Sequence, residues 1–294
     1  MPFHGVRPER QYLFNPTPVT DIAVNDVNAW RLNSNHRHIY NKLHVALSQG
    51  LNAAPCGVNP LLSGLNADDP CFVKPITNLG GMSLNTFSTS AQALSQSTLH
   101  LPENKAGNCA AGSFWCEFLE GPQTSSDVLI HDGQPVWYAH TRAASEKNRN
   151  RPIYWEIGAD CEHLEPAIER FVQREMVSYT GLCNVEMIGE SIIEVHLRGS
   201  NAFFDYYCAG FMAAWVNLVD NDSWEGLEPI KQGCLYSMFG DWSLPDNTET
   251  LVEARGARLY RDGMMADRVG IIFAEQPASA GEIELMLRNR SQDQ

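Results

Sequence analysis

The sequence predicts an α+β protein, because hairpin signals and separate helical patterns occur along the same chain. Gly189-Glu190 and Asp132-Gly133 are two-residue turn signals, each between apolar segments that favour antiparallel strands. The segment 163–179 repeats apolar residues at helical spacing. The apolar stretch 203–219 is interrupted by polar residues and is too short to span a membrane, which favours a buried helix. Antiparallel hairpins combined with separate helices define the α+β class.

The composition limits the classes of partner that the protein can have. Its 294 residues, with 44% hydrophobic and 19% charged, are typical of a globular chain that can form two compact units. The net charge of −14 argues against nucleic-acid or membrane partners, which need a basic patch. The eight cysteines stand singly, and the N-terminus lacks the apolar region of a secretory signal. We therefore expect a cytoplasmic protein without a nucleic-acid or membrane partner.

The first segment of interest is a helix that carries a lysine. Residues 1–34 contain several prolines and are predicted to form an extended N-terminal arm. From Asn35, apolar residues at helical spacing predict a helix that ends near Gly50. Lys42 lies near the apolar face of this helix, so its ammonium group can reach into a cleft. The alternative is a solvated lysine, which is the commoner outcome.

A second lysine and a glycine loop follow. Lys74 stands in the middle of the apolar strand 71–76, and a buried lysine is costly unless an anion neutralises it. The next segment, TNLGGMS, offers backbone N–H groups and hydroxyls that suit phosphate oxygens. It matches neither the G-x-x-x-x-G-K-[ST] nor the G-x-G-x-x-G nucleotide loop. An ordinary strand-to-turn transition would also use Gly-Gly, so this alternative stays open.

The remaining elements are predicted from shorter patterns. A weak helix is expected at 90–99, a strand that ends at Phe118 comes next, and a polar surface loop is expected at 142–152. The helix at 163–179 is expected to end at Gly181. After a helix at 201–220, the sequence predicts an irregular segment at 224–247 and strands at 251–259, 268–274 and 282–287.

The hairpin at 181–200 has the most unusual composition. Glu186 and Glu194 each stand among aliphatic residues, and a buried carboxylate is costly unless it is paired or bound to a metal. With the turn at Gly189-Glu190, the two glutamates share a face and can point at one divalent ion. The alternative is an edge strand whose glutamate faces water. The hairpin alone does not decide between these interpretations.

The order of these motifs resembles the ATP-grasp superfamily, the fold of D-alanine:D-alanine ligase, biotin carboxylase and the carboxylate-amine ligases. The motifs are the Lys42 helix, FVKPI with TNLGGMS, WCEFLEGPQTSSDVLI, a helix, and NVEMIGESIIEVHLRGS. The resemblance implies two α+β subdomains with mainly antiparallel sheets that enclose a nucleotide cleft. It divides the chain into the arm 1–34, a small subdomain 35–118 with the lysines and the glycine loop, and a large subdomain 119–294 with the metal-binding hairpin.

The resemblance also implies an ATP site to which both subdomains contribute. Lys42 and Lys74 would contact the phosphates, and the glycine loop of Gly80, Gly81, Met82 and Ser83 would close over them. The hinge strand, with Glu117, Phe118 and Leu119, would read adenine through its backbone. Gln123 would replace the usual ribose-binding glutamate.

The same resemblance assigns the metal ligands and one catalytic residue. Glu186 and Glu194 would hold Mg²⁺, with Mn²⁺ as the alternative ion. His196 occupies the position usually taken by a metal-binding asparagine, and Arg198 matches an arginine that stabilises the acyl phosphate or the tetrahedral intermediate. An imidazole prefers softer ions than Mg²⁺. For His196, contact with phosphate, a pH-sensing role or an orientation away from the site are therefore the alternatives.

The function implied is an ATP- and Mg²⁺-dependent ligase that joins a small-molecule carboxylate to an amine through an acyl phosphate. Such chemistry needs positioning and charge neutralisation rather than a protein nucleophile. In the superfamily, a full α/β domain usually precedes the lysine-bearing helix, but only about 40 residues precede Lys42 here. We therefore expect a second copy or a partner chain to cover the cleft. The alternatives are a non-catalytic nucleotide-binding or scaffolding protein and a phosphotransferase on the same fold.

Overall fold

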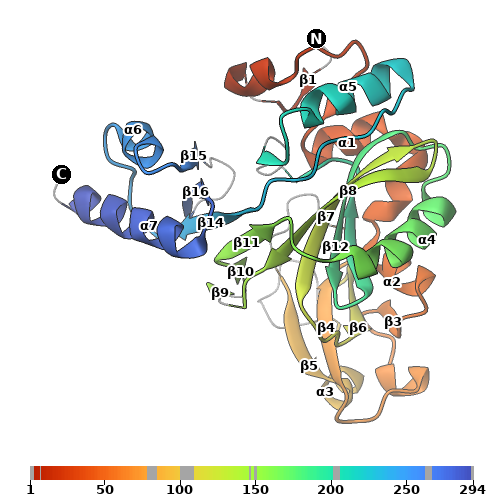
Figure 1. Ribbon diagram of the computed structural model, residues 1–294. Coiled ribbons are helices and arrows are strands. Elements are labelled where there is room, and N and C mark those ends of the chain that lie inside the picture. Colours follow the sequence, from red (N-terminus) through yellow and green to blue (C-terminus); the bar gives the residue numbers. More distant parts are fainter. Residues whose placement is uncertain are drawn as a thin grey trace.

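The computed structural model describes residues 3–6, 8–77, 85–99, 109–145, 147–148, 151–200, 206–261 and 267–292. The predicted phosphate loop of Gly80, Gly81, Met82 and Ser83 lies outside the described residues. Within them, the chain forms an eight-stranded and a four-stranded sheet, in both of which neighbouring strands run antiparallel (Figure 1). The α+β prediction is therefore confirmed.

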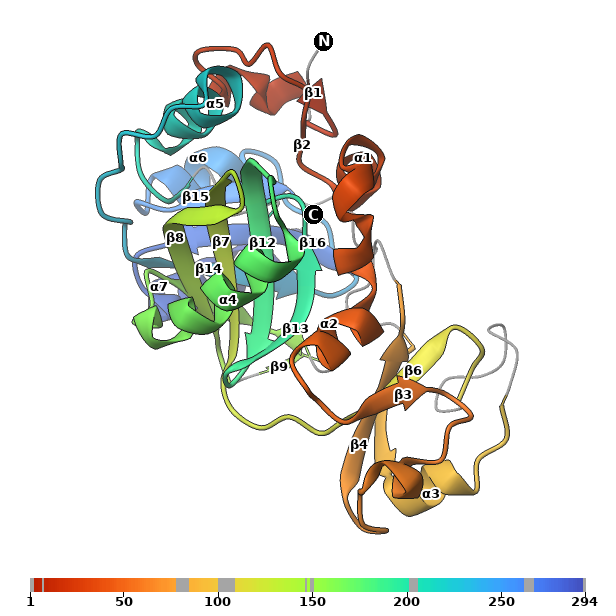
Figure 2. The same cartoon turned by 90° about the vertical axis from the view of Figure 1, so that its right-hand side faces the viewer.

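The four-stranded sheet carries the predicted Lys74 strand. Its order is β3-β6-β4-β5, formed by Ala53–Pro55, Ser113–Glu117, Pro70–Pro75 and Phe87–Ser90. The short helices η3 (Pro60–Ser63) and α3 (Ala91–Ser95) pack against each other at the side of this sheet. Figure 2 shows that this unit projects away from the body of the molecule. The strand at 71–76, the strand that ends near Phe118 and the short helix after residue 90 are confirmed.

The eight-stranded sheet has the order β13-β12-β7-β8-β11-β14-β16-β15. Both predicted hairpins belong to it, because two residues connect β7 to β8 and β12 to β13. In the sheet order, the strands are Ser191–His196, Gly181–Ile188, Gln123–His131, Gln134–Ala143, Tyr154–Ile157, Gly233–Phe239, Arg268–Ala274 and Arg258–Arg261. Two further pairs of two-residue strands are β1 (Phe3–His4) with β2 (Ile22–Ala23), and β9 (Lys147–Asn148) with β10 (Arg151–Pro152).

The N-terminal segment is not one extended arm. It contains η1 (Pro8–Leu13) and α1 (Asp26–Leu32), and the Asn25 side chain caps α1 by accepting a hydrogen bond from the Asn28 backbone. The helix predicted from Asn35 is divided into η2 (Ser34–Tyr40) and α2 (Lys42–Ser48). Asn41 separates them because its side chain caps α2. In Figure 2, α1, η2 and α2 run down the side of the large sheet towards the small one.

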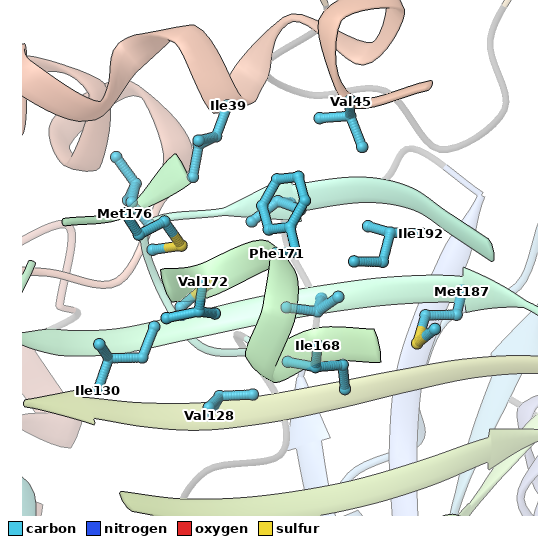
Figure 3. Close-up of a cluster of buried hydrophobic side chains, with 14 of the residues drawn as sticks. Ile39, Val45, Val128, Ile130, Ile168, Phe171, Val172, Met176, Met187 and Ile192 are labelled. Carbon is cyan, nitrogen blue, oxygen red and sulfur yellow. The ribbon is translucent and has the colours of Figure 1, made fainter. Parts of the chain in front are cut away.

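One face of the large sheet is covered by α4 (Glu165–Glu175), which follows the short η4 (Glu162–Leu164). Ile168, Phe171 and Val172 of α4 are buried against β7 and β12, and Ile39 and Val45 from η2 and α2 join the same cluster (Figure 3). Each side chain of this kind contributes about 1.5–3 kcal/mol when fully buried. This core therefore fixes the lysine-bearing helix against the large sheet.

The opposite face packs against α5 (Phe211–Asn221) and the N-terminal residues. Phe211 and Trp215 of α5 are buried together with Phe14, Ile22 and Leu129. In the part of the chain that the structure describes, no helix has both the length and the apolar character that crossing a membrane requires.

The C-terminal predictions were partly wrong. The segment expected to be irregular contains β14, an inner strand of the large sheet. Of the late strands, only 268–274 is confirmed. The range 251–259 contains the end of α6 (Thr248–Glu253) and the start of β15, and 282–287 lies inside α7 (Pro277–Gln292). In α7, Ala280, Ile283 and Leu287 are buried at helical spacing. A six-residue window is too short to separate this period from that of a strand.

Two boundaries near the middle of the chain also differ from the prediction. The helix expected to reach Gly181 ends at Glu175, and Gly181 is the first residue of β12. The segment 142–152 was expected to be a surface loop, but it contains the end of β8 and the short strands β9 and β10.

The tight turn of the β12–β13 hairpin depends on Gly189. Its φ of +56° is in the left-handed region, and a Cβ placed there would lie 2.8 Å from the carbonyl oxygen of Glu120. Gly121 faces it from the other side, since a Cβ at Gly121 would lie 2.8 Å from the Gly189 Cα. Two glycines thus allow the connection between the sheets to pass close to the hairpin.

We expect Gly189→Ala to lower the free energy of unfolding by about 2–4 kcal/mol, from left-handed strain together with the backbone clash. Gly50→Ala is the matched control, because Gly50 also has a positive φ (+81°) but no atom lies within 4 Å of the added Cβ. Its cost should be limited to about 1–2 kcal/mol. Urea denaturation of both variants measures the difference, and equal losses would mean that the close approach to Glu120 does not constrain the hairpin.

Candidate functional site

The two hairpin glutamates lie directly opposite each other. Glu186 of β12 pairs with Glu194 of β13, and a bulge follows at Glu186/Met187. Both side chains are partly buried, with exposed fractions of 28% and 21%. The shared face expected from the turn position is therefore present. β13 is also an edge strand, as the alternative proposed, but its glutamate is not simply exposed to water.

Both predicted lysines reach β13. Lys42 is buried, and its Nζ lies 2.9 Å from Glu194 Oε2, so the solvated alternative does not hold for it. Lys74 donates a hydrogen bond of 3.2 Å from Nζ to the carbonyl of Ile193, and its Nζ lies 5.5 Å from the centroid of the Phe114 ring. Burial and the charge of Lys42 lower the pKa of Lys74 to about 8.

His196 lies between the glutamates and an acidic residue that sequence reasoning missed. Its Nδ1 is 2.8 Å from Asp26 Oδ1, and its Nε2 is 3.4 Å from Glu194 Oε1 and 3.9 Å from Glu186 Oε1. The contact with Asp26 at Nδ1 orients the imidazole ring, so that Nε2 is directed towards the glutamates. His196 therefore faces the site. The orientation away from it, which the sequence left open, is excluded.

Arg198 is held by the same aspartate. Its Nη2 donates to Asp26 Oδ2 at 2.8 Å, and its Nη1 donates to the Gly199 carbonyl at 3.2 Å. Its Nε is buried and has no hydrogen-bond partner among the residues that the structure describes. Tyr40 completes the arrangement, because its hydroxyl donates to Asp26 at 3.3 Å and accepts from the backbone N–H of Leu197. A buried donor without a partner, such as the Arg198 Nε–H, costs about 1–3 kcal/mol, and it is a typical contact for a bound anion.

The carboxyl pKa values reflect this charge distribution. Burial alone would raise the pKa of Asp26, but the charges and hydrogen bonds of His196 and Arg198 outweigh it and hold that pKa well below its ordinary value. Burial and the charge of Glu194 raise the pKa of Glu186. Burial alone would also raise the pKa of Glu194, but the charges of His196 and Lys42 outweigh burial and lower this pKa. Of the two glutamates, Glu186 therefore has the less compensated charge.

A buried polar network supports the segment after β13. Asp127 of β7 accepts hydrogen bonds from Asn184 Nδ2 at 2.7 Å, from the Tyr207 hydroxyl at 2.9 Å and from the Ser200 backbone at 2.9 Å. Burial nevertheless raises the pKa of Asp127 to about 6. Sequence reasoning did not find this network. Asn184 is the cross-strand partner of His196, so the network fixes the backbone beside the site.

The predicted hinge residues lie where the two sheets connect. Glu117 is fixed through its side chain, which accepts from the Asn52 backbone at 2.9 Å, and Phe118 donates its backbone N–H to Pro70 at 3.0 Å. Among the described residues, the backbone N–H of Leu119 has no hydrogen-bond partner. Gln123 begins β7 opposite Ile188. These residues thus join the small sheet to the strand beside the hairpin.

The hairpin has a donor set that fits Mg²⁺, although it is not a complete cage. In the described part of the chain, it does not bring three side-chain ligand atoms within 4.8 Å of one another. Mg²⁺ is usually bound by only one or two carboxylates together with substrate phosphates. Glu186 makes no side-chain hydrogen bond among the described residues. Because the pKa of its carboxyl group is raised, a nearby cation would stabilise the ionised form. The residues present therefore fit the ion.

A cavity of about 610 Å³ is lined in part by Leu197, which lies between His196 and Arg198 in the sequence. It is bordered by the N-terminal segment around Ile22, by η2 around His36, by the residues around Tyr179 and by Trp215 of α5. None of the residues predicted for ATP, metal or catalysis lines it. The candidate site is therefore defined by its charged groups rather than by the shape of this cavity.

The Asp26 contacts give a stability prediction. Asp26→Ala leaves Arg198 buried without its carboxylate, and loss of one partner of a buried pair costs about 3–5 kcal/mol. Because the pKa of Asp26 is lowered, its contribution is present above the ordinary value of 3.8 and is lost as the pH falls below it. Urea denaturation at pH 7 and pH 3 should therefore show a difference between wild type and variant that shrinks in acid.

Asp21→Ala is the matched control, since Asp21 pairs with His4 at 3.1 Å but is 58% exposed. An exposed pair contributes only about 0–1 kcal/mol. A loss in Asp26→Ala no larger than in this control would contradict the anchoring role of Asp26.

Comparison with known proteins supports the arrangement at the level of the fold. No protein-family model matches the sequence, and no curated protein is similar to it in sequence. Among solved structures, phosphoribosylamine–glycine ligase from Thermotoga maritima has a TM-score of 0.61 at 13% identity, covering 91% of this chain and 78% of its own.

Two further structures show the same similarity. Carboxyaminoimidazole ribonucleotide synthase from Aspergillus clavatus, complexed with ATP, has a TM-score of 0.57 at 12% identity, covering 89% of this chain and 75% of its own. L-amino acid ligase from Bacillus licheniformis has a TM-score of 0.56 at 15% identity, covering 90% and 75%. The chain therefore has the fold that the order of its motifs predicts, with antiparallel sheets in two α+β units.

Proposed function

We propose that this chain, which has an ATP-grasp fold, is an ATP- and Mg²⁺-dependent ligase that joins a small-molecule carboxylate to an amine. The observation that carries the proposal is the meeting at β13 of two lysines, Lys42 and Lys74, with two carboxylates, Glu186 and Glu194. Each pair brings like charges together, and nucleotide phosphates with a divalent cation would compensate both. Two of the similar structures are, by their names, ligases for amine or amino-acid substrates.

The phosphate side of the site consists of the lysines. The pKa of Lys74 is lowered by burial and by Lys42, so an anion placed beside both ammonium groups would stabilise their charged forms. The Nε–H of Arg198, which has no hydrogen-bond partner within the described part of the chain, offers a further donor to an anionic oxygen. The loop from Gly80 to Ser83 would close over the phosphates, and its role rests on the sequence pattern alone.

The metal side consists of Glu186, Glu194 and His196. The two carboxylates suit Mg²⁺, and the imidazole Nε2 makes Mn²⁺ the alternative ion. When bound, the ion neutralises phosphate charge and orients the transferred group. Asp26 positions His196 through the 2.8 Å contact at Nδ1 and thereby directs Nε2 towards the glutamates.

The adenosine would lie against the connection between the sheets. Leu119 has a backbone N–H that makes no hydrogen bond within the described residues, and such a group can donate to an adenine ring nitrogen. Glu117 and Phe118 hold this segment in place through Asn52 and Pro70. Gln123 offers its amide to a ribose hydroxyl.

In the proposed reaction, an oxygen of the substrate carboxylate attacks the γ-phosphorus of ATP, and ADP leaves. The amine nitrogen then attacks the carbonyl carbon of the acyl phosphate, and inorganic phosphate leaves while the nitrogen loses a proton. Arg198 would stabilise the negative charge that develops on the transferred and tetrahedral groups. The chain positions the reactants and neutralises charge, and no protein nucleophile takes part.

The setting of the reaction is also part of the proposal. We place the protein in the cytoplasm, because all eight cysteines are free and reducing conditions keep thiols in that state. The substrates are small molecules, and a second copy of the chain or a partner chain would cover the open side of the cleft.

A second candidate function is a non-catalytic nucleotide-binding or scaffolding protein. The observation that favours it is the engagement of both Glu194 oxygens, Oε2 by Lys42 at 2.9 Å and Oε1 by His196 at 3.4 Å. If these contacts persist when nucleotide is bound, they would substitute for the metal and allow binding without turnover.

The test compares Glu186→Gln with Glu190→Gln. Glu190 lies in the turn of the same hairpin and is exposed, so it serves as the matched control. Glu186→Gln keeps the shape but removes the charge proposed to hold the metal, and ADP formation should fall by roughly 100-fold or more. ADP release is measured with ATP, Mg²⁺ and a panel of carboxylic acids, with hydroxylamine to trap acyl phosphates as hydroxamates.

The outcomes separate the candidate functions. Hydroxamate formation by wild type and Glu190→Gln, but not by Glu186→Gln, would support the ligase. Calorimetric binding of ATP with Mg²⁺ but no ADP across the panel would favour the non-catalytic protein. A stable phosphorylated product would instead indicate a phosphotransferase. Absence of ATP binding by the folded wild-type protein would overturn the proposal.

The lowered pKa of Lys74 gives a pH prediction. The protonated amine binds phosphate, so the affinity for ATP should weaken as the pH rises above about 8, by up to roughly 10-fold per pH unit. Lys74→Arg keeps the positive charge at these pH values and should remove this dependence. Isothermal titration at pH 7, 8 and 9 measures it. Equal pH dependence in wild type and Lys74→Arg would show that Lys74 does not contact the nucleotide.

A further inference from the structure

A second group of potential metal ligands lies outside the proposed active site. His38 of η2, His44 of α2 and Glu175 at the end of α4 bring one nitrogen of each imidazole and a carboxylate oxygen within 4.8 Å of one another. The three side chains come from three different elements, and the fold brings together His44 and Glu175, which are 131 positions apart in the sequence. None of them has a role in the proposed ligase site.

The distances are close to those of a bound transition metal. His44 Nε2 lies 2.8 Å and His38 Nε2 lies 3.7 Å from the same oxygen, Glu175 Oε2. A tetrahedral zinc ion with bonds of about 2.0–2.2 Å places its ligand atoms about 3.3–3.6 Å apart. The imidazole rings have centroids 5.4 Å apart and are nearly perpendicular. Small rotations of the side chains are therefore sufficient to enclose an ion.

The ligand chemistry selects the class of metal. Two imidazole nitrogens and one carboxylate suit Zn²⁺ and its neighbours, whereas Mg²⁺ prefers oxygen ligands alone. The two histidine side chains are 41% exposed, which leaves a path from solvent and room for a fourth ligand such as water. Glu175 is only 12% exposed and forms the floor of the group.

The surrounding contacts hold Glu175 ready for this role. Its Oε1 accepts a hydrogen bond from Arg174 Nε at 2.7 Å, which leaves Oε2 for the histidines. Burial opposes the charge, but hydrogen bonds from Arg174 and His44 outweigh it and lower the pKa of Glu175, so the carboxylate is ionised at neutral pH. The backbone of His44 is fixed by the Asn41 cap. Metal binding would replace the 3.0 Å contact between His38 Nε2 and the Glu175 carbonyl.

We infer that His38, His44 and Glu175 form a binding site for Zn²⁺ or a similar transition metal. The ion would join η2 and α2 to the end of α4 and thus fix the helix that carries Lys42, two residues before His44, against the large subdomain. The inference does not depend on the proposed ligase activity. Its physical consequence is that metal binding stabilises the fold, since the ligands come from separate elements.

The test is titration of the full-length protein with ZnCl₂ after removal of metals by a chelator, without nucleotide and with excess Mg²⁺. Wild type should bind one Zn²⁺ that is lost in His44→Gln and in Glu175→Gln. The Zn²⁺ affinity of each variant should fall by more than roughly 10- to 100-fold, the loss that is typical when a residue that only contacts a metal ligand is removed. Zn²⁺ should also raise the melting temperature of wild type, and Co²⁺ in its place should give the visible absorption of a tetrahedral site.

His131→Gln is the matched control. His131 also contacts a carboxylate, Asp222, at 2.6 Å, but it does not belong to the three-ligand group. Zn²⁺ binding should be unchanged in this variant. The metal-free melting temperatures of all variants show whether each one folds. If His44→Gln or Glu175→Gln does not fold, His38→Gln, at an exposed position, is tested in its place. Absence of Zn²⁺ binding by wild type, or equal binding by wild type and His44→Gln, would overturn the inference and leave an ordinary histidine–glutamate ion pair.

Discussion

The candidate site depends on one unfavourable interaction, the cross-strand pairing of Glu186 with Glu194. Like charges that face each other on neighbouring strands destabilise a sheet, and partial burial increases the cost. The chain offsets it unequally. Lys42 and His196 compensate Glu194, whose carboxyl pKa is lowered, whereas the pKa of Glu186 stays raised. The hairpin is thus folded with one carboxylate neutralised by the protein and another that still favours a cation.

The same hairpin explains how the two sheets are held together. β13 is an edge strand, and an exposed edge invites pairing with another chain unless it is covered. Gln49 exchanges two hydrogen bonds with the Ile192 backbone, at 2.8 and 2.7 Å, and Lys74 from the small sheet donates to Ile193 at the bulge. The groups that close the edge therefore come from the elements that would bind phosphate. The contacts that cover the edge are therefore also those that bring the residues of the proposed nucleotide site together.

Local patterns predicted the hairpins, the Lys74 strand and the facing glutamates, because each depends on residues within a few positions of each other. They did not predict Asp26, since its contacts with His196 and Arg198 join residues 170 and 172 positions apart and no spacing rule links them. Tyr40 and Asp127 were missed for the same reason. The late strands failed differently, because short apolar windows such as 282–287 fit either period and only packing in α7 decides. Charge clusters within one hairpin can thus be read from sequence, but their distant partners cannot.

The residue that departs from the resemblance is explained by one of those distant partners. An asparagine is expected where His196 stands, and an imidazole differs in carrying two nitrogens on opposite sides of a ring. One nitrogen contacts Asp26 on α1, and the other faces Glu186 and Glu194. Because Asp26 also binds Arg198, a single carboxylate from the N-terminal segment positions two site residues on β13 and just beyond it. Histidine therefore suits this chain because the N-terminal segment contributes directly to the charge balance of the site.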